Sequence, residues 1–334
     1  MKLTIYLIPL LLFAYPAMAS DAFKLHGEIH ATHDISAAAF LVDLLVIGAD
    51  EAVGKDKNEN YIQLLKREGE NYRLSSDMLV YKGDKHSGRE LDIEGVAVEG
   101  GRIYVVGSHA LARKRVKSGN SYEKNLQRLA TIKQEPGRKQ LFRLTLESNN
   151  SVSKREQISL EKIIRNDPTL APFAAIPSKE NGIDIEAVAA KKGALYLGFR
   201  GPVLRGGFVP VMQLDFDAPE KSYRLLYLNL GGLGIRDMVS VADGFLLLAG
   251  PVAELPNAYR LYHWNGLDTL PGSNNGALKL LTEIRPPAGG KAEAVAVERT
   301  TDSSYNIIIL FDGIKGGAPR HYTISRARLE SGGK

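Results

Sequence analysis

Residues 92–107 read DIEGVAVEGGRIYVVG, and residues 184–198 repeat the same pattern as DIEAVAAKKGALYLG. Each stretch begins with a short strand of small and β-branched residues, then has a glycine-containing turn, and ends in a continuous apolar run. Three further copies share this order of features: RDMVSVADGFLLLAG (236–250), EAVAV with IIILFDG (293–313), and a degenerate ISAAAF with LLVIG (35–48). The chain therefore repeats one unit of two buried, antiparallel strands along its length.

Two strands with alternating apolar and polar residues are expected after each of the first four copies along the chain. Their ranges are 61–67 and 78–81, 140–146 and 155–160, 209–216 and 223–229, and 259–264 and 278–284. Repeated units of four antiparallel strands, with almost no helical periodicity, are typical of a β-propeller. The sequence predicts an all-β, five-bladed β-propeller, although the long stretch from Glu94 to Glu186 leaves room for a sixth blade. Two separate β-sandwich domains would not explain why one motif recurs along the whole chain.

The last unit is one strand short, because only residues 322–329 follow its inner pair before the chain ends. Residues 22–29, AFKLHGEI, alternate as a strand should and precede the first inner strand. A strand donated by one terminus closes a ring and removes a free sheet edge. We therefore predict that this N-terminal strand completes the last blade.

The first residues, MKLTIYLIPLLLFAYPAMAS, have the features of a secretory signal peptide. Lys2 supplies the positive charge, an apolar stretch follows, and Ala17-Met18-Ala19 is a cleavage motif. We predict a signal peptide over residues 1–19, cleavage after Ala19 and a periplasmic or secreted protein. Residues 20–334 then form a single propeller domain with loop insertions at about 110–139 and 161–183, no membrane span and no nucleic-acid partner.

The composition excludes several kinds of site. The 334 residues contain no cysteine, so disulfides, thiolate zinc sites and cysteine nucleophiles are excluded. The sequence also lacks the HExxH, GxSxG and P-loop motifs of zincins, α/β-hydrolases and NTPases. The net charge of +5 is compatible with an anionic ligand.

A ring of acidic residues is expected at one mouth of the central channel. The two inner strands of a blade are antiparallel, so the start of the first lies beside the end of the second. This places the residues that begin the motifs around one opening: Glu94, Glu186, Asp237 and Glu293, with Ser36 in the degenerate copy. Ca²⁺ takes six to eight oxygen ligands and suits such a ring. The alternative is that these side chains accept hydrogen bonds from backbone amides of the adjacent blade.

Polar residues at the ends of the second strands, and a basic loop, are expected on the same face. They include Asp50, Ser108, His109 and Arg200, with Arg205 and Arg236 nearby, while residues 113–139 carry nine Lys or Arg against two Glu. Long loops on one side of a rigid scaffold usually carry the function. We predict that Ser108, His109, Arg200, Arg205 and Arg236 bind an anionic small molecule or glycan. If the protein is an enzyme, we expect a metal-dependent hydrolase of phosphate esters. His109, Arg200 and Arg236 are then the catalytic candidates. A periplasmic protein-interaction scaffold is the third alternative.

The chain resembles an uncharacterised bacterial domain-of-unknown-function family of propeller type. The resemblance covers most of the mature chain and is carried by LDIEGVAVEGGRIYVVGSHA, NGIDIEAVAAKKGALYLGFRGPVLRGG and LGGLGIRDMVSVADGFLLLAGP. The chain is also similar, more distantly, to the phytase-like esterase propellers and to the calcium-activated nucleotidases. In those families acidic channel residues bind calcium. That similarity implies Glu94, Glu186 and Glu293 as calcium ligands, with less support for Asp237. Ser36 stands where a fifth carboxylate would be, and neither family's catalytic motif has a clear copy.

Overall fold

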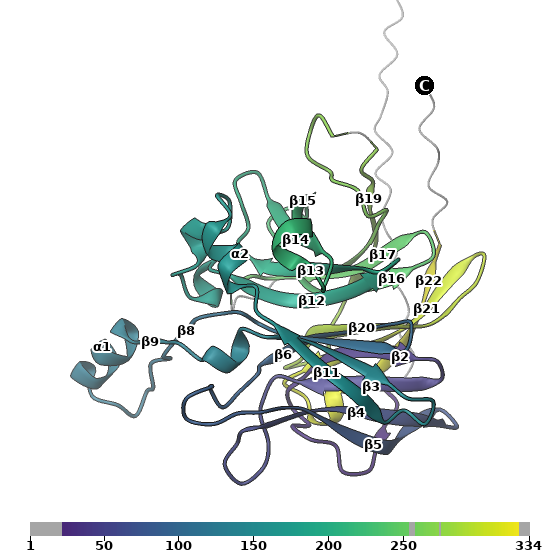
Figure 1. Cartoon of the computed structure of the whole chain (residues 1–334), viewed down its shortest axis with the longest axis horizontal. Coiled ribbons are helices and arrows are strands. Elements are labelled where there is room, and N and C mark those ends of the chain that lie inside the picture. The colour runs from purple at the N-terminus through teal and green to yellow at the C-terminus, as the bar shows by residue number, and fades with distance from the viewer. Residues whose placement is uncertain (1–21, 254–257, 274, 327–334) are drawn as a thin grey trace, which may run out of the picture.

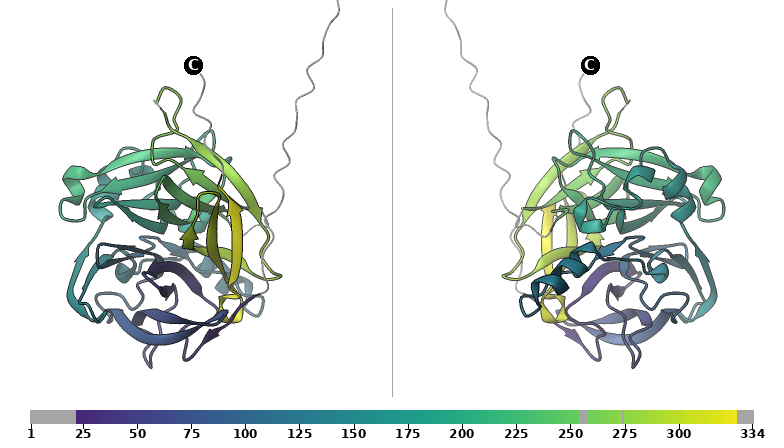
Figure 2. Two further views of the ribbon diagram at one scale, coloured as in Figure 1. Left: turned by 90° about the vertical axis from the view of Figure 1, so that its right-hand side faces the viewer. Right: turned by 90° about the vertical axis from the view of Figure 1, so that its left-hand side faces the viewer.

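The computed structural model describes residues 22–253, 258–273 and 275–326, and in this part of the chain five sheets stand around a central axis (Figures 1 and 2). The five-bladed, mostly β arrangement is confirmed. The stretch from Glu94 to Glu186 adds a two-stranded sheet but no sixth blade among the described residues. The predicted signal peptide, residues 1–19, lies outside them.

The blades follow one another along the chain, and the strand nearest the axis is named first in each. The first contains β2 (Ile35–Leu41), β3 (Leu44–Ala49), β4 (Glu59–Glu68), β5 (Asn71–Lys82) and β1 (Leu25–His26). The second contains β6 (Ile93–Glu99), β7 (Arg102–Gly107), β10 (Leu141–Leu146) and β11 (Val152–Ile158). The third contains β12 (Asp184–Lys191), β13 (Ala194–Gly201), β14 (Phe208–Leu214) and β15 (Arg224–Asn229). The fourth contains β16 (Gly234–Val241), β17 (Gly244–Gly250), β18 (Tyr259–Trp264) and β19 (Leu278–Ile284). The fifth contains β20 (Lys291–Thr300), β21 (Ser304–Asp312) and β22 (Arg320–Ser325).

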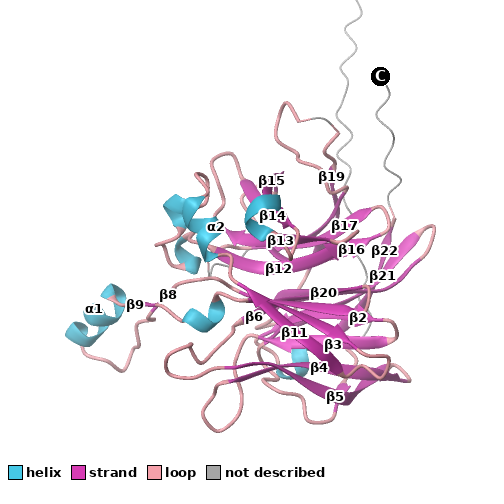
Figure 3. Ribbon diagram, viewed as in Figure 1, coloured by secondary structure: helices cyan, strands magenta, loops and turns pink. Residues whose placement is uncertain are grey.

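Within the described ranges, helices occur only in the segments between these strands (Figure 3). The first insertion forms β8 (Ala112–Arg113), α1 (Tyr122–Ala130) and β9 (Ile132–Lys133), and the second contains α2 (Glu161–Asn166). A third helix, α3 (Pro219–Ser222), lies in the hairpin between β14 and β15. These helices are too short for their periodicity to be recognised in the sequence. Among the described residues, no helix is long and apolar enough to cross a membrane.

The hydrophobic core lies between the faces of neighbouring blades. Phe245 stacks on Trp264 of its own blade at 5.0 Å between ring centroids, and Tyr196 of the preceding blade lies 4.6 Å from Phe245. Near the axis the blades approach so closely that a Cβ added to Gly95 would lie 2.7 Å from the backbone nitrogen of Val188 in the next blade. The small residues of the inner strands thus permit the close packing around the axis.

A β-bulge occurs at the same place in the innermost strand of every blade. In each case the pairing with the second strand skips one residue. The skipped residues are Ser36, Glu94, Glu186, Arg236 and Glu293. A bulge leaves one residue unpaired and redirects its side chain, and all five of these residues line the axial cavity. We call them the axial ring.

The N-terminal segment does not complete the last blade, and this prediction was wrong. Only Leu25 and His26 form a strand, which pairs in parallel with β5 on the outer edge of the first blade. Gly27, with φ of 103°, ends the extended segment, so the alternation read from the sequence is not used further. The described part of the last blade has three strands.

The first and last blades nevertheless lie side by side, in purple and yellow in Figures 1 and 2. Phe23 bridges them: its backbone N–H donates to the carbonyl of Pro319, and its ring lies 5.5 Å from Tyr72 and 4.6 Å from His321. The ring thus closes through side-chain packing, several backbone hydrogen bonds between the two blades and the ion pair of Arg67 with Glu298, not through a shared strand.

Candidate functional site

A cavity of about 1290 Å³ lies on the propeller axis, and all five blades contribute to its lining. Its carboxylate residues are Asp34, Asp50, Glu51, Glu90, Asp92, Glu94, Glu180, Asp184, Glu186, Glu293 and Asp312. Its basic residues are Arg113, Lys114, Arg115, Arg138, Lys179, Arg200, Arg236 and Lys291. Residues of both loop insertions are among them, so the insertions lie on the cavity side of the propeller. Carboxylates outnumber cations in this lining.

In the half of the cavity formed by blades three to five, arginine and carboxylate side chains form ion pairs. The buried guanidinium of Arg236 contacts Glu293 on one side and lies 2.8 Å from Glu186 Oε2 on the other. Arg200 Nη1 lies 2.7 Å from Glu186 Oε1 and 3.8 Å from Asp184 Oδ2. Burial would lower the pKa of Arg236, but Glu186 and Glu293 outweigh it and hold that pKa above its usual range. The two arginines therefore already have carboxylate partners.

The half formed by blades one and two is acidic. Oxygen atoms of Asp50, Asp92 and Glu94 all lie within 4.8 Å of one another. Asp92 accepts a hydrogen bond from Ser108 and pairs with Arg138 at 3.0 Å, whereas the buried Oδ1 of Asp50 has no hydrogen-bond partner among the described residues. We call Asp50, Asp92 and Glu94 the acidic triad.

Two carboxyl groups of the acidic triad, those of Asp50 and Glu94, have raised pKa values. Burial, followed by the nearby Asp92, raises the pKa of Asp50 to about 9. Burial and the charge of Glu186 raise the pKa of Glu94 well above its ordinary value. Protons, or a bound cation, must compensate such a cluster.

The structure brings three of the four residues predicted as metal ligands to the axis, namely Glu94, Glu186 and Glu293. Asp237 is not with them. Its carboxylate oxygens accept hydrogen bonds from the backbone N–H groups of Met238 and of Val295 in the next blade, each at 2.7 Å. The bulge gives the axial position of this blade to Arg236. Asp237 therefore makes the contacts of the alternative interpretation, in which the acidic side chain accepts hydrogen bonds from backbone amides of the adjacent blade.

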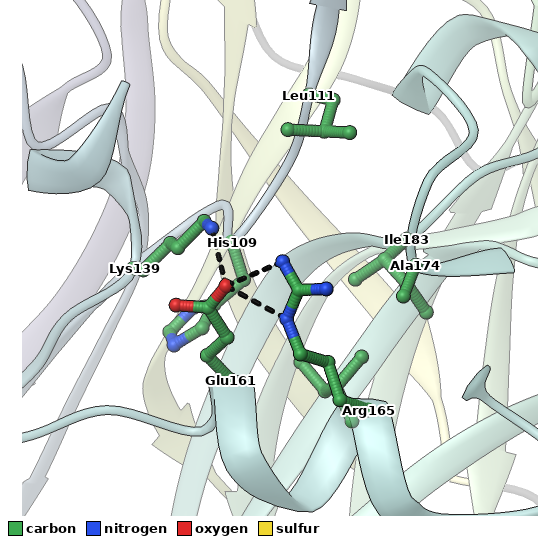
Figure 4. Close-up of a pocket in the computed structure, with 8 residues that line it drawn as sticks. His109, Leu111, Lys139, Glu161, Arg165, Ala174 and Ile183 are labelled. Carbon is green, nitrogen blue, oxygen red and sulfur yellow. Dashed lines mark hydrogen bonds and ion pairs between the residues drawn. The ribbon is translucent and has the colours of Figure 1, made fainter. Parts of the chain in front are cut away.

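The residues predicted to bind ligand separate into two groups. Arg200 and Arg236 line the axial cavity, and Ser108 is buried with its hydroxyl on Asp92. Arg205 is exposed in the loop of residues 201–207 and does not line the cavity. His109 lines a different, smaller pocket (Figure 4).

His109 is held as a neutral imidazole in that smaller pocket. Its Nδ1–H donates to the carbonyl of Gly107 at 2.9 Å, and its Nε2 accepts from the N–H of Leu160 at 3.3 Å. Both ring nitrogens are therefore occupied. Burial lowers the pKa of His109 to about 4, and we assign it no role in the axial cavity.

The chain matches the family described as "Protein of unknown function (DUF3616)" over residues 34–321. It belongs to the DUF3616 family. The resemblance to a domain-of-unknown-function family of propeller type is thereby confirmed. Among curated proteins, none matches the chain.

Several solved structures are similar to this DUF3616 protein in chain path. A GH43 β-1,3-galactosidase has a TM-score of 0.48 and 11% identity, with coverage of 92% of this chain and 60% of that chain. An exo-1,5-α-L-arabinanase from a bovine ruminal metagenomic library has a TM-score of 0.42 and 10% identity, with coverage of 93% and 94%. A putative glucose dehydrogenase from Thermus thermophilus has a TM-score of 0.37 and 14% identity, with coverage of 92% and 99%. At these values the similarities carry no argument about activity.

Sequence reasoning did not assign roles to several cavity residues of this DUF3616 protein. Asp92 and Asp184 stand two residues before the axial-ring glutamates in both DIE motifs, so their repetition was a usable signal. Asp50 was placed at the mouth but not among the metal ligands. Arg138 comes from the first insertion and had no local signal, because only the fold brings it to Asp92.

The free energy of unfolding of this DUF3616 protein is expected to fall as the pH drops from about 6.5 towards 4. The unfolded chain protonates His109 near its ordinary pKa of 6.5, whereas the folded chain does so only near 4. The stabilisation is thus complete above about pH 6.5 and decreases below it by about 1.4 kcal/mol per pH unit, or roughly 3 kcal/mol at pH 4. Lys139 and Glu161 face His109, and hydrogen bonds from Lys139 and Arg165 hold the pKa of Glu161 below its usual range.

Denaturant unfolding across this pH range, compared between the wild type and His109→Gln, measures the effect. The other titrating groups are common to both proteins, so the difference isolates His109. His33→Gln, at an exposed histidine, is the matched control and should retain the wild-type pH dependence. Equal slopes for the wild type and His109→Gln would contradict the assignment of a neutral, buried His109.

Proposed function

We propose that this protein binds Ca²⁺ at the acidic triad and, together with that cation, a glycan-type ligand in the axial cavity. The observation that carries the proposal is the asymmetric pairing of charges. Arg200 and Arg236 already have carboxylate partners, whereas Asp50 and Glu94 have no cationic partner among the described residues. Near the axis, the carboxyl groups without a cationic partner are thus those of Asp50 and Glu94, which attract a cation or hydroxyl donors.

The oxygen donors of the acidic triad fit calcium. Two oxygens bound to one Ca²⁺ at 2.3–2.6 Å lie at most about 5 Å apart, and the triad oxygens lie within 4.8 Å of one another. The buried, unpartnered Oδ1 of Asp50 supplies a second observation in favour of a ligand there. The described cavity lining contains no histidine, and the chain contains no cysteine, so zinc is a poorer match.

A hydroxyl-rich ligand fits the rest of the lining. Sugar hydroxyl groups both donate and accept, and the cavity presents carboxylates next to guanidinium groups on blades three to five. An isolated anion would have to compete with Glu186 and Glu293 for Arg200 and Arg236. We therefore favour a glycan over a simple anionic molecule, although the basic first insertion at the mouth accommodates acidic groups on that glycan.

A calcium-dependent phosphoesterase is the second candidate. The basic residues at the mouth, such as Lys114, favour it because they attract phosphate esters. In that reaction the cation would polarise a phosphoryl oxygen, and a cavity carboxylate, not His109, would activate water. Calcium-dependent hydrolysis of a phosphoester panel that is lost in Glu94→Gln would favour this candidate, and no turnover would count against it.

Calcium is expected to raise the melting temperature of the protein, and chelator should reverse the effect. At a free concentration one hundred times the Kd, a ligand specific for the folded state adds about 2.7 kcal/mol to the free energy of unfolding. Asp50→Asn removes one oxygen ligand and should abolish most of this shift. Glu51→Gln, the adjacent cavity residue outside the triad, makes the same charge change and should retain the shift.

Isothermal titration with calcium on the same three proteins gives a direct reading. The absence of both heat and a melting shift in the wild type would refute the metal site. Titration of acidic and neutral oligosaccharides, with calcium and with chelator, then tests the ligand. Binding that is unaffected by chelator would separate the glycan site from the metal.

A further inference from the structure

The first insertion extends away from the propeller as an arm, which we define as residues 112–133 (Figure 1). Its base is held by pairing of β8 with β9 and by the guanidinium of Arg113, which binds Glu180 and the carbonyl of Leu129. Beyond this base, α1 makes few contacts with the blades, and none of its nine residues is buried. The arm is therefore a fixed projection with solvent around its tip.

A helix of this length has little stability of its own. Isolated helices shorter than about 12–15 residues are marginal in water, and most helices in proteins are stabilised by packing of an apolar face. The N-cap hydrogen bond from the N–H of Lys124 to the Ser121 hydroxyl contributes locally, but no residue of the arm is buried. The missing element is a surface against which the helix packs.

The arm presents apolar side chains to solvent. Tyr122, Leu126 and Leu129 are spaced by four and three residues, so they lie on one side of α1, and Val116 and Ile132 flank them in the chain. These five side chains, which we call the apolar patch, are between 39% and 72% exposed. Only three other large hydrophobic residues of the described chain are exposed, and they lie apart on other elements: Val42, Leu267 and Leu280.

Basic residues surround the apolar patch. The arm carries seven Lys or Arg and only one acidic residue, Glu123. Lys117, Lys124 and Lys133 are exposed. A short helix with an apolar side, carried on a segment rich in Lys and Arg, is typical of segments that lie on anionic membranes.

We propose that the arm docks the protein onto an anionic phospholipid surface, with the apolar patch inserted among the headgroups and the lysines on the phosphates. A stable protein–protein interface uses roughly 20–30 residues on each side, far more than this projecting patch offers. Lipid supplies apolar and anionic atoms together and needs no complementary shape. Lysine suits it, since an ammonium group acts as a point charge without the fixed geometry of a guanidinium. Val116 and Leu129 also line the axial cavity, so docking brings the cavity mouth close to the lipid surface.

Flotation of the full chain with vesicles tests the proposal. We expect binding to vesicles of phosphatidylglycerol and phosphatidylcholine, at least tenfold weaker binding to phosphatidylcholine alone, and release by high salt. The double variant Leu126→Glu with Leu129→Glu should bind at least tenfold more weakly. Leu267→Glu, at an exposed leucine outside the arm, is the matched control and should float like the wild type.

A charge variant separates the two contributions. Lys117→Glu with Lys124→Glu should lose the preference for anionic vesicles, whereas Lys279→Glu, at an exposed lysine of β19, should keep it. An unchanged melting temperature of each variant shows that the propeller is intact. Equal flotation with both vesicle types, or no flotation, would overturn the proposal. So would a dimer in light scattering that Leu126→Glu dissociates, because the apolar patch would then contact a second copy.

Discussion

Arg236→Leu is expected to lower the free energy of unfolding by about 3–5 kcal/mol, the range for removing one partner of a buried ion pair. Arg236 is buried between Glu186 and Glu293, which come from the blades on either side of its own. Without the guanidinium, Glu293 loses its cationic partner and Glu186 keeps only Arg200. Denaturant unfolding at neutral pH measures the loss.

Arg205→Leu provides the matched control for this substitution. The chemical change is the same, but Arg205 is exposed and does not line the cavity, so we expect an effect within about 0.5 kcal/mol. Adding Glu293→Gln to Arg236→Leu should recover part of the loss, because it removes the negative charge that Arg236→Leu leaves without its partner. A loss below about 1 kcal/mol for Arg236→Leu, or no recovery in the double variant, would show that Arg236 is not needed to neutralise the ring.

Asp237→Ala is expected to lower the free energy of unfolding by about 2–3 kcal/mol, since it leaves buried backbone donors without acceptors. The Asp237 carboxylate accepts from Met238 within its own strand and from Val295 in the next blade. It therefore links the fourth and fifth blades close to the axis. Asp237→Asn retains one acceptor oxygen and should lose less, about 1 kcal/mol.

Hydrogen exchange at the Val295 amide distinguishes this link from a general effect on stability. Exchange at Val295 should accelerate more in Asp237→Ala than at core amides of the first blade. Asp302→Ala, at an exposed aspartate in the turn between β20 and β21, should change neither quantity. Normal protection of Val295 in Asp237→Ala would mean that another group satisfies this amide.

The roles of Arg236 and Asp237 differ from the sequence prediction by one residue. In the sequence, Asp237 aligns with the glutamates as the acidic residue that begins the motif. In the structure, the bulge places Arg236 in the axial ring and turns Asp237 to the backbone. Because side chains alternate along a strand, a shift of one position changes the face on which a residue lies. The predicted ring of four acidic residues is therefore three glutamates, an arginine and a serine.

Other differences have a similar origin. His109 follows the second strand of its blade, as the sequence indicated, but its ring turns into the pocket beside Glu161 instead of the axial cavity (Figure 4). Residues 22–29 alternate between apolar and polar side chains as the sequence indicated. Only Leu25 and His26 of this segment form a strand, however, and they pair with the first blade instead of the last. Neither outcome could be read from local periodicity, since each depends on segments far away in the chain.

The inner-strand motif by itself determined the all-β class, the number of blades and the small residues at the axis. These properties follow from alternation, turns and apolar runs within some fifteen residues, which the sequence displays directly. Only the tertiary structure decided which side chain of each motif faces the axis, which carboxylates share a guanidinium and which remain uncompensated. Those outcomes depend on bulges and on contacts between different blades, where residues separated by fifty or more positions, such as Asp237 and Val295, meet.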